Sequence, residues 1–359
     1  GGSSPSAPAV QPPRGLARAP RRRGCRRMRD LALRPQIAVC VRPFSDAELA
    51  AGARSCLTAR GQRLCILPRH ADAAPADGAA GTAPGRGDAA DELCAGDTFS
   101  FDWCYDRSGA DGPAEAAPEA QERLFRDLGL PLARSALRGL DSCLLAYGQS
   151  GAGKSHAVVG SPEAPGLLPR ATEQILSQQL PHLSVFLSAL EITPHETLHD
   201  LLSPSAPSRP LAAVEHPALG PHVPGLMEAA CAGPGAAGRL LRSCTRMRAA
   251  AAVDFGTASR SHVLYSLRLQ RGATGHAFQG TLASGPGEGA TLVFADLAGS
   301  EASSSSAAAA CGRPVALNTS LLALRHAVQT LVEGPRSGAQ VPALGVSPLL
   351  QLLRGALLS

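Results

Sequence analysis

One short segment limits what this chain can fold into more than any other. Residues 148–155 read Gly-Gln-Ser-Gly-Ala-Gly-Lys-Ser, which matches the phosphate-binding loop pattern G-x-x-x-x-G-K-[ST] at every fixed position. An apolar run of strand length, residues 143–147, precedes it, and residues 155–159 can open a helix. Such a pattern also occurs by chance on turns that bind nothing, but a strand, a glycine loop and a helix together aim backbone N–H groups at phosphate oxygens. The sequence therefore predicts an α/β nucleotide-binding domain.

The lysine in this segment is exceptional within the chain. Lysine and arginine together number 34, and Lys154 is the only lysine among them. The planar guanidinium of arginine serves wherever a surface cation is needed, but it does not replace a compact ammonium that reaches between two phosphates. A lysine at this one position supports the nucleotide interpretation.

Composition limits the classes of protein to which this chain can belong. With 359 residues, of which 44% are hydrophobic, the chain is long enough for one large α/β domain or two smaller ones. Aromatic residues make up only 3%, so we expect the core to rest on Leu, Val and Ala. We find no apolar stretch long enough to span a bilayer and no apolar region of a signal peptide, so we expect a soluble protein.

The 10 cysteines form no C-x-x-C pair and no close cluster with histidine of the kind that binds a metal. Isolated cysteines in such a chain are expected to be small buried apolar side chains in a reducing compartment. This pattern places the protein in the cytosol or the nucleus.

The chain divides into a tail and one domain. Residues 1–34 are rich in arginine and proline, and Asp30 is their only acid, which predicts a disordered basic arm. A nuclear-localisation patch, or a stretch upstream of a start at Met28, are alternatives, and nucleic acid is not the expected partner. Strands and helices alternate through residues 35–359, which predicts one layered α/β domain, interrupted by a low-complexity insertion loop at residues 69–97.

Three further segments carry polar groups at the ends of predicted elements. Asp296 directly follows the predicted apolar strand 292–295. At the end of such a strand, a carboxylate can orient the Mg²⁺ shell of a phosphate-loop enzyme. Residues 259–262, Ser-Arg-Ser-His, end a polar loop and lead into another apolar strand. The lone asparagine, Asn318, opens a predicted helix at residues 317–324. Each segment alone is weak support for an enzyme, but together they form an ordered set.

Taken in this order, the motifs resemble the kinesin motor domain. The resemblance extends over nearly all of residues 36–359, and residues 99–105 and 215–223 look most like the kinesin-3 branch, from which the chain diverges. The matching segments are residues 41–44, 146–155, 259–262, 296–301, 318–324, 341–342 and 347–357.

The resemblance implies a fold, an activity and a partner. The fold would be that of a P-loop NTPase with a central, mostly parallel eight-stranded sheet and three helices on each face. The activity would be that of a microtubule-binding motor ATPase, which hydrolyses ATP to ADP and phosphate with Mg²⁺. Its partner would be tubulin, and its location the microtubule cytoskeleton of the cytoplasm.

The resemblance also implies roles for the residues at matching positions. Lys154 would contact the β- and γ-phosphates, and the metal set would be the Ser155 hydroxyl and Asp296. The nucleotide-binding set is Pro43, Gly148, Gln149, Ser150, Gly151, Ala152, Gly153, Lys154, Ser155 and His156, with Pro43 and His156 flanking the adenine. The catalytic set is Lys154, Ser259, Arg260, Gly299 and Glu301, in which Arg260 would pair with Glu301 and the Gly299 amide would sense the γ-phosphate.

Several positions depart from the family pattern. Phe255 and Ala258 stand where the family has Asn and Ser, and Cys40 stands where an adenine-contacting arginine is usual. Residues 302–310 are a run of Ala and Ser, the expected lysine-rich insertion is missing, and the chain ends without a neck or coiled coil. These departures motivate an alternative function, a non-catalytic nucleotide- and microtubule-binding module. A second alternative, prompted by the missing first Met, is a chain that yields little stable protein.

Overall fold

The computed structural model describes residues 35–66, 97–108, 117–180, 182–203, 211–216, 220–233, 235–255, 261–271, 289–300, 319–333 and 347–358. The predicted basic arm and nearly all of the predicted insertion loop lie outside these residues, so both stay predictions. The chain separates into two units, residues 1–37 and 38–359, and every described helix and strand lies in the second.

A six-stranded sheet lies at the centre of the second unit. Its strand order is β11-β7-β12-β13-β6, with β8 pairing on β7. Almost every residue of β12 and β13 is buried, because both faces of the sheet are covered. The strands are β6 (Ser142–Ala146), β7 (Leu183–Ile192), β8 (Leu198–Asp200), β11 (Ala229–Ala230), β12 (His262–Arg271) and β13 (Gly289–Asp296).

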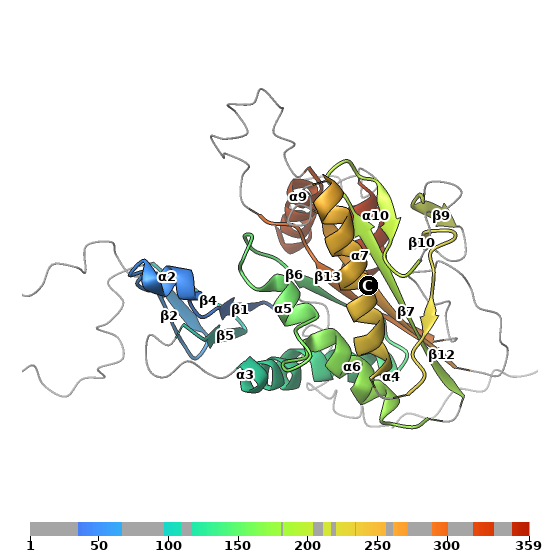
Figure 1. Cartoon of the computed structure of the whole chain (residues 1–359), viewed down its shortest axis with the longest axis horizontal. Helices are drawn as coiled ribbons and strands as arrows, with labels where there is room; N and C mark the ends of the chain where they lie inside the picture. The colour runs from blue at the N-terminus through green and yellow to red at the C-terminus, as the bar shows by residue number, and fades with distance from the viewer. Residues whose placement is uncertain are drawn as a thin grey trace, which may run out of the picture. The chain divides into compact units, whose positions relative to one another are not determined.

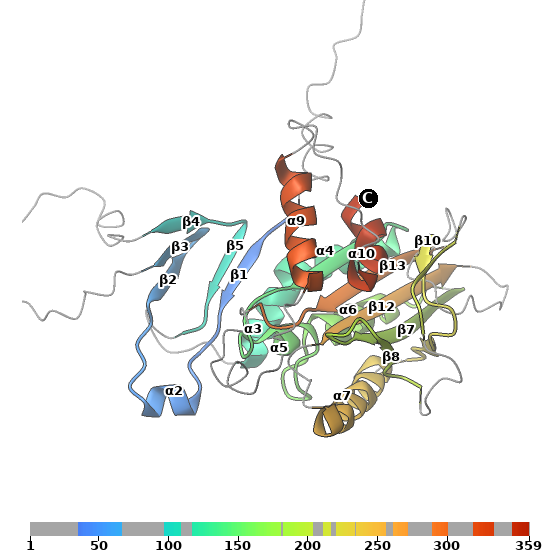
Figure 2. The same cartoon turned by 90° about the horizontal axis from the view of Figure 1, so that it is seen from above.

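Helices cover the two faces of this sheet, and side chains of the long strands alternate between them. Along β12, Tyr265 and Leu267 face one core cluster, whereas Leu264 faces the other. Figure 2 shows the sheet between α7 on one face and α9 and α10 on the other. The helices of the first face are α3 (Ala117–Leu124), η1 (Phe125–Gly129), α4 (Leu130–Leu137), α6 (Leu167–Leu176) and α7 (Ala236–Phe255); those of the second are α9 (Thr319–Glu333) and α10 (Pro348–Leu358).

The predicted α/β class with a central sheet is confirmed, but the predicted strand directions differ from those observed. Within the described residues, β13 and β6 are parallel, whereas β11–β7, β7–β8, β7–β12 and β12–β13 are antiparallel. The described part also contains six strands in this sheet rather than eight. Strands buried on both faces have continuous apolar runs whichever way they point, so the sequence carries no signal for their direction.

The run from α3 to α4 is one continuous helical segment with a π-helical turn, η1, in its middle. Gly129 closes this turn, and a Cβ there would lie 2.6 Å from the Phe125 Cδ2 atom, so any larger residue would displace the Phe125 ring. A π-turn accommodates one more residue than an α-turn, and such turns often lie at functional sites.

Smaller sheets precede and flank the central one (Figure 1). A parallel pair joins β1 (Ala38–Val41) to β5 (Trp103–Asp106). The other elements are the antiparallel strands β2 (Leu57–Arg60), β3 (Arg63–Ile66) and β4 (Thr98–Ser100), the hairpin β9 (Val214–His216) and β10 (Gly220–His222), and the short helix α2 (Asp46–Ala50).

One buried ion pair spans the edge of the central sheet. Arg268 on β12 donates from Nε and Nη2 to the two carboxylate oxygens of Glu228, at 2.9 and 2.6 Å. Its guanidinium also lies 4.7 Å from the ring centroid of Phe186 on β7. Both charged side chains are more than nine-tenths buried. Each charge therefore depends on the other for stabilisation.

The cysteines differ from the prediction. Among the described residues, Cys231 and Cys244 are buried free thiols, whereas the free thiols Cys40 and Cys56 belong to exposed residues. Cys65 is buried and disulfide-bonded. Spacing along the chain cannot show which thiols packing will cover, so cysteine usage gives no support for a reducing compartment. In the described part of the chain, every helix is too short or too polar to cross a membrane.

Candidate nucleotide-binding site

The glycine-rich segment connects β6 to α5 (Lys154–Val158), as the sequence predicts. Gly151 and Gly153 have φ values of +77° and +91°, a left-handed conformation that side chains with a Cβ rarely adopt. Gly153 is the residue that caps α5, so the chain turns sharply from strand to helix. The turn directs the first N–H groups of α5 toward the loop, which is the arrangement that binds phosphate.

Lys154 closes the loop on itself. Its Nζ donates to the carbonyl oxygens of Gly148 and Gln149, at 2.9 and 2.8 Å. The ammonium is therefore held over the loop rather than extended into solvent. A cation in this position can neutralise the oxygens of phosphates bound by the loop.

Ser155 and Asp296 meet at the ends of two parallel strands. The register pairs Asp296, the last residue of β13, with Ala146, the last residue of β6. The Ser155 Oγ donates to Asp296 Oδ2 at 2.5 Å, and Asp296 is 2% exposed. A hydroxyl and a carboxylate are oxygen donors of the kind that Mg²⁺ accepts. The predicted metal set is therefore brought together, and its chemistry fits the ion.

Arg248 of α7 joins this pair to a second carboxylate, and the sequence analysis missed it. Its Nη1 lies 3.4 Å from Asp296 Oδ2, and its Nε lies 3.4 Å from Glu191 Oε1 on β7. The Ser261 Oγ also donates to Glu191 Oε1, at 2.5 Å, and the Ser261 carbonyl accepts from Arg248 at 3.2 Å. One cation thus compensates two buried carboxylates. No local pattern distinguishes Arg248 from the other arginines of its helix.

The segment after Asp296 lies against the loop. The Ser300 amide donates to the Gly148 carbonyl at 3.0 Å, and the Leu297 amide donates to the Ala146 carbonyl at 3.2 Å. Gly299 is therefore held near the predicted phosphate site. The Ala298 amide donates to His262 Nδ1 at 3.1 Å, which brings two of the predicted motifs together. Ser259, Arg260 and Glu301, like Ala258, lie outside the described residues, so their roles stay predictions.

His156 is packed against α3. Its ring Nδ1 lies 2.8 Å from Gln121 Nε2, and its carbonyl accepts from the same amide nitrogen at 2.6 Å. Burial lowers the pKa of the imidazole, and the Arg107 guanidinium adds to that effect, so the neutral ring is favoured. Gln121 is fully buried, and its Oε1 has no partner among the described residues. It is a second polar group that the sequence analysis missed.

Pro43, the other predicted adenine neighbour, follows β1. Its carbonyl accepts from Arg42 Nη1 at 2.8 Å, and Arg42 forms a bidentate pair with Glu48 at 2.7 and 2.6 Å. Among the described contacts, none joins Pro43 to His156. That the two residues flank an adenine therefore stays a prediction.

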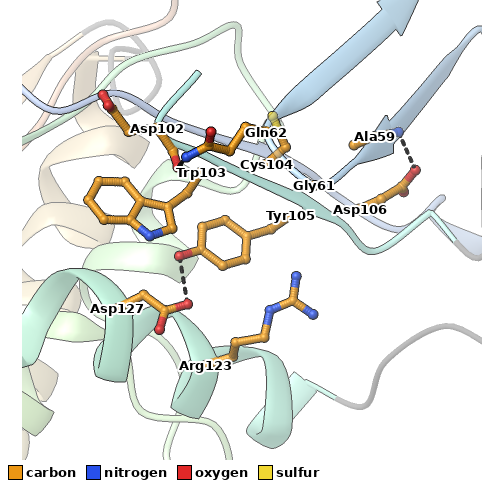
Figure 3. A pocket seen from close by; sticks show the side chains of 10 residues that line it. All are labelled: Ala59, Gly61, Gln62, Asp102, Trp103, Cys104, Tyr105, Asp106, Arg123 and Asp127. Carbon is orange, nitrogen blue, oxygen red and sulfur yellow. Dashed lines mark hydrogen bonds between the residues drawn. The ribbon is translucent and has the colours of Figure 1, made fainter. Parts of the chain in front are cut away.

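A separate cavity of about 560 Å³ lies between β5 and the helical segment α3–η1 (Figure 3). Figure 3 shows the Tyr105 ring pointing to η1, where its hydroxyl donates to Asp127 Oδ2 at 3.0 Å. The Arg123 guanidinium lies 4.8 Å from the same ring. The predicted nucleotide-binding residues are not among those that line this cavity. The cavity is therefore distinct from the loop site.

These elements define a P-loop nucleotide-binding protein: a glycine loop between strand and helix, with its hydroxyl on the carboxylate at the end of the adjacent parallel strand. The sequence profile of the kinesin motor domain matches residues 41–357, and the chain belongs to that family. Within it, the chain is most like the kinesin-3 branch, which confirms the resemblance.

Similar proteins support this assignment. The chain is 30% identical over 325 residues to human StAR-related lipid transfer protein 9, a match that covers 87% of this chain and 6% of that protein. It is 30% identical to human kinesin-like protein KIF1C over 65% of this chain and 20% of that protein. The chain therefore spans a small part of these relatives.

Two solved structures share the fold, each with a TM-score of 0.66. One, described as a KIF14 dimer in a two-heads-bound state with AMP-PNP in complex with a microtubule, is 26% identical, and the match covers 89% of this chain and 84% of that one. The other, described as a fast kinesin, is 23% identical, and the match covers 90% of this chain and 82% of that one.

Proposed function

We propose that this chain is a microtubule motor head that binds ATP with Mg²⁺ and hydrolyses it to ADP and phosphate. The observation that carries the proposal is the hydrogen bond between Ser155 and Asp296 at the mouth of the glycine loop. It supports the proposal because it brings together two oxygen donors that would hold Mg²⁺ next to Lys154, which would contact the phosphates. Membership of the kinesin motor domain family supports the choice of ATP and of the microtubule as partner.

The residues of the loop would act mainly by positioning and by electrostatic stabilisation, which is what phosphoryl transfer requires. Backbone N–H groups of residues 148–155 and the Lys154 ammonium would hold the phosphate oxygens. Ser155 and Asp296 would hold Mg²⁺, which supplies positive charge to the developing negative charge of the phosphates. The amide of Gly299 would contact the γ-phosphate, and Ser259, Arg260 and Glu301 would close the site.

We assign the head to the microtubule cytoskeleton of the cytoplasm. One solved relative is described in complex with a microtubule. Because this chain belongs to the same family, we propose the same partner for it. The test is cosedimentation with microtubules in the presence of an ATP analogue and of ADP, combined with phosphate release. Stronger pelleting with the analogue and microtubule-stimulated release are expected. Equal pelleting in both states, together with release that microtubules leave unchanged, would refute the motor assignment.

Ser155→Ala should separate metal-dependent binding from phosphate binding. Loss of the hydroxyl removes one proposed Mg²⁺ ligand, so ATP affinity in Mg²⁺ should fall by about 10- to 100-fold. ATP affinity in EDTA should change little, because the loop amides and Lys154 remain. Titration calorimetry in both buffers measures the difference. Ser177→Ala, at an exposed position after α6, is the matched control. An equal loss in both buffers would contradict a metal role for Ser155.

The alternative, a module that binds nucleotide without useful turnover, rests on Phe255 and Ala258, where the family has Asn and Ser. If those departures limit hydrolysis, the double change Phe255→Asn/Ala258→Ser should raise phosphate release by about tenfold or more, since it restores polar groups near the γ-phosphate. Single-turnover release compares the two chains, with ATP affinity measured in parallel. An unchanged rate at equal affinity would show that these positions are not the cause of slow turnover.

A further inference from the structure

Among the described residues, Arg107 is a buried cation with no anion paired to it. The residue is 9% exposed, and its Nε atom is fully buried with no hydrogen-bond partner among the described residues. No ion pair joins its guanidinium to a carboxylate within the described ranges. Burying an unpaired charge costs free energy, so such a group in a native fold is expected to have a partner in the functioning state.

The position of Arg107 is that of a ligand contact. It follows β5 directly, and its backbone N–H donates to the Val41 carbonyl at the end of β1, at 3.0 Å. The strands β1 and β5 are parallel, so their carboxyl ends lie at the same edge. Ligands of α/β proteins bind beyond the carboxyl ends of parallel strands. Pro43 lies just beyond the same end of β1.

Packing links this edge to the helix that follows the glycine loop. Tyr105, two residues before Arg107, donates to Asp127 Oδ2 of η1 at 3.0 Å. Gln121 of α3, in the same helical segment, lies 2.8 Å from the ring Nδ1 of His156 in α5. The end of β5 and the His156 side of α5 therefore meet the same helical segment.

The contacts of α5 distinguish two sides of the loop site. Ser155 faces Asp296 of β13, which is the side of the metal and the γ-phosphate. His156, the next residue, faces Gln121 of α3 instead. With the metal and the γ-phosphate on the Asp296 side, the side that remains for the base is that of α3, β1 and Arg107. A planar guanidinium is suited to this partner, because it stacks on aromatic rings and donates to ring nitrogens.

We propose that Arg107 is a nucleobase-contacting residue, whose guanidinium packs on the purine ring of the bound nucleotide and donates to it. The inference rests on the proposed nucleotide binding and adds a specificity residue to it. Arg107 was not among the residues that the motifs suggested, because nothing in the local sequence of β5 marks it. It is brought to the site by the pairing of β1 with β5.

The test uses the full chain and three ligands, each with Mg²⁺: ATP, ribose 5-triphosphate, which lacks only the base, and inorganic tripolyphosphate. In titration calorimetry, Arg107→Met should weaken ATP binding by about tenfold or more, since it removes a charged hydrogen-bond donor. Binding of the other two ligands should not change. Arg126→Met, at a side chain that is 64% exposed, is the matched control and should leave all three affinities unchanged.

The other outcomes are distinguishable. Equal losses for all three ligands would assign Arg107 to the phosphates, and losses for ATP and ribose 5-triphosphate alone would assign it to the ribose; either result overturns the base contact. Parent and variant with the same ATP affinity would also overturn it while leaving the proposed function intact. A parent that binds neither ATP nor tripolyphosphate would overturn the proposed function and this inference together.

Two further measurements separate a ligand contact from a structural role. The thermal midpoint of ligand-free Arg107→Met should equal or exceed that of the parent, because the variant removes an uncompensated buried charge. A lower midpoint would indicate a structural partner and contradict the proposal. In the same variant, Cys40→Arg should restore most of the lost ATP affinity, since it supplies a guanidinium from the neighbouring strand. No recovery in a folded double variant would count against the assigned position.

Discussion

Replacing Lys154 by alanine is expected to reduce ATP turnover by about 10²- to 10³-fold, the effect of removing one positioned charge from a transition state. The reason is geometric as well as electrostatic, because the Nζ is held over the loop by the carbonyl oxygens of Gly148 and Gln149. The chain contains no second lysine that could substitute. Phosphate release with and without microtubules, together with ATP affinity, measures the loss.

Lys154→Arg separates the effect of charge from that of shape, since it keeps the positive charge but replaces a compact ammonium with a planar guanidinium. It should recover little of the activity if the lysine must reach between two phosphates. Thermal midpoints of both variants show whether they remain folded. Arg126→Ala, at an exposed side chain, serves as the control. Turnover of Lys154→Ala equal to that of the parent would contradict the proposed ATPase.

Glu228→Ala should have the largest effect on stability. Glu228 and Arg268 are each more than nine-tenths buried and share two hydrogen bonds, so the variant leaves an uncompensated guanidinium inside the sheet. Removing one partner of such a pair costs about 3–5 kcal/mol. That is a large share of the roughly 5–15 kcal/mol by which domains are usually stable. The free energy of unfolding in urea measures it.

The chain offers a matched control for this variant. Arg354 and Glu215 form a pair at 3.4 Å, but their side chains are 48% and 50% exposed. Glu215→Ala should therefore cost only about 0–1 kcal/mol, because solvent screens the pair. The double variant Glu228→Leu/Arg268→Met should recover most of the stability, since neither charge remains buried. Equal losses for Glu228→Ala and Glu215→Ala would contradict the role of burial.

The parts of the site that the sequence predicted are those encoded by adjacent residues. The loop, its left-handed glycines, and the strand and helix around it form one local pattern. Asp296, 141 residues from Ser155, was predicted from a second local pattern, an apolar strand that ends in an acid, and the fold brings the two together. The family and the α/β class followed from the order of such motifs. Local patterns are visible in one sequence because backbone geometry restricts the residues that can stand there.

The parts that the sequence did not predict depend on packing between distant elements. Arg248, Glu191 and Gln121 belong to α7, β7 and α3, and each reaches the site through the tertiary fold. The antiparallel pairings of β7, β12 and β13 were also missed, because burial on both faces conceals strand direction. Which cysteines are covered depends on the same packing.

The π-helical turn η1 sets the angular phase between the part of its helix that packs on the core and the part that reaches the site. Each residue of an α-helix advances about 100° around the axis, and the wider π-turn absorbs one extra residue, so tightening η1 to an α-helical turn with that residue kept would rotate α3 by about that amount relative to α4. Ala133 and Ala136 could stay in the core, but Gln121 would turn away from His156. The π-turn thus sets the angular alignment of α3 on α4, and the chain could lose its alignment at the nucleotide site without losing a helix.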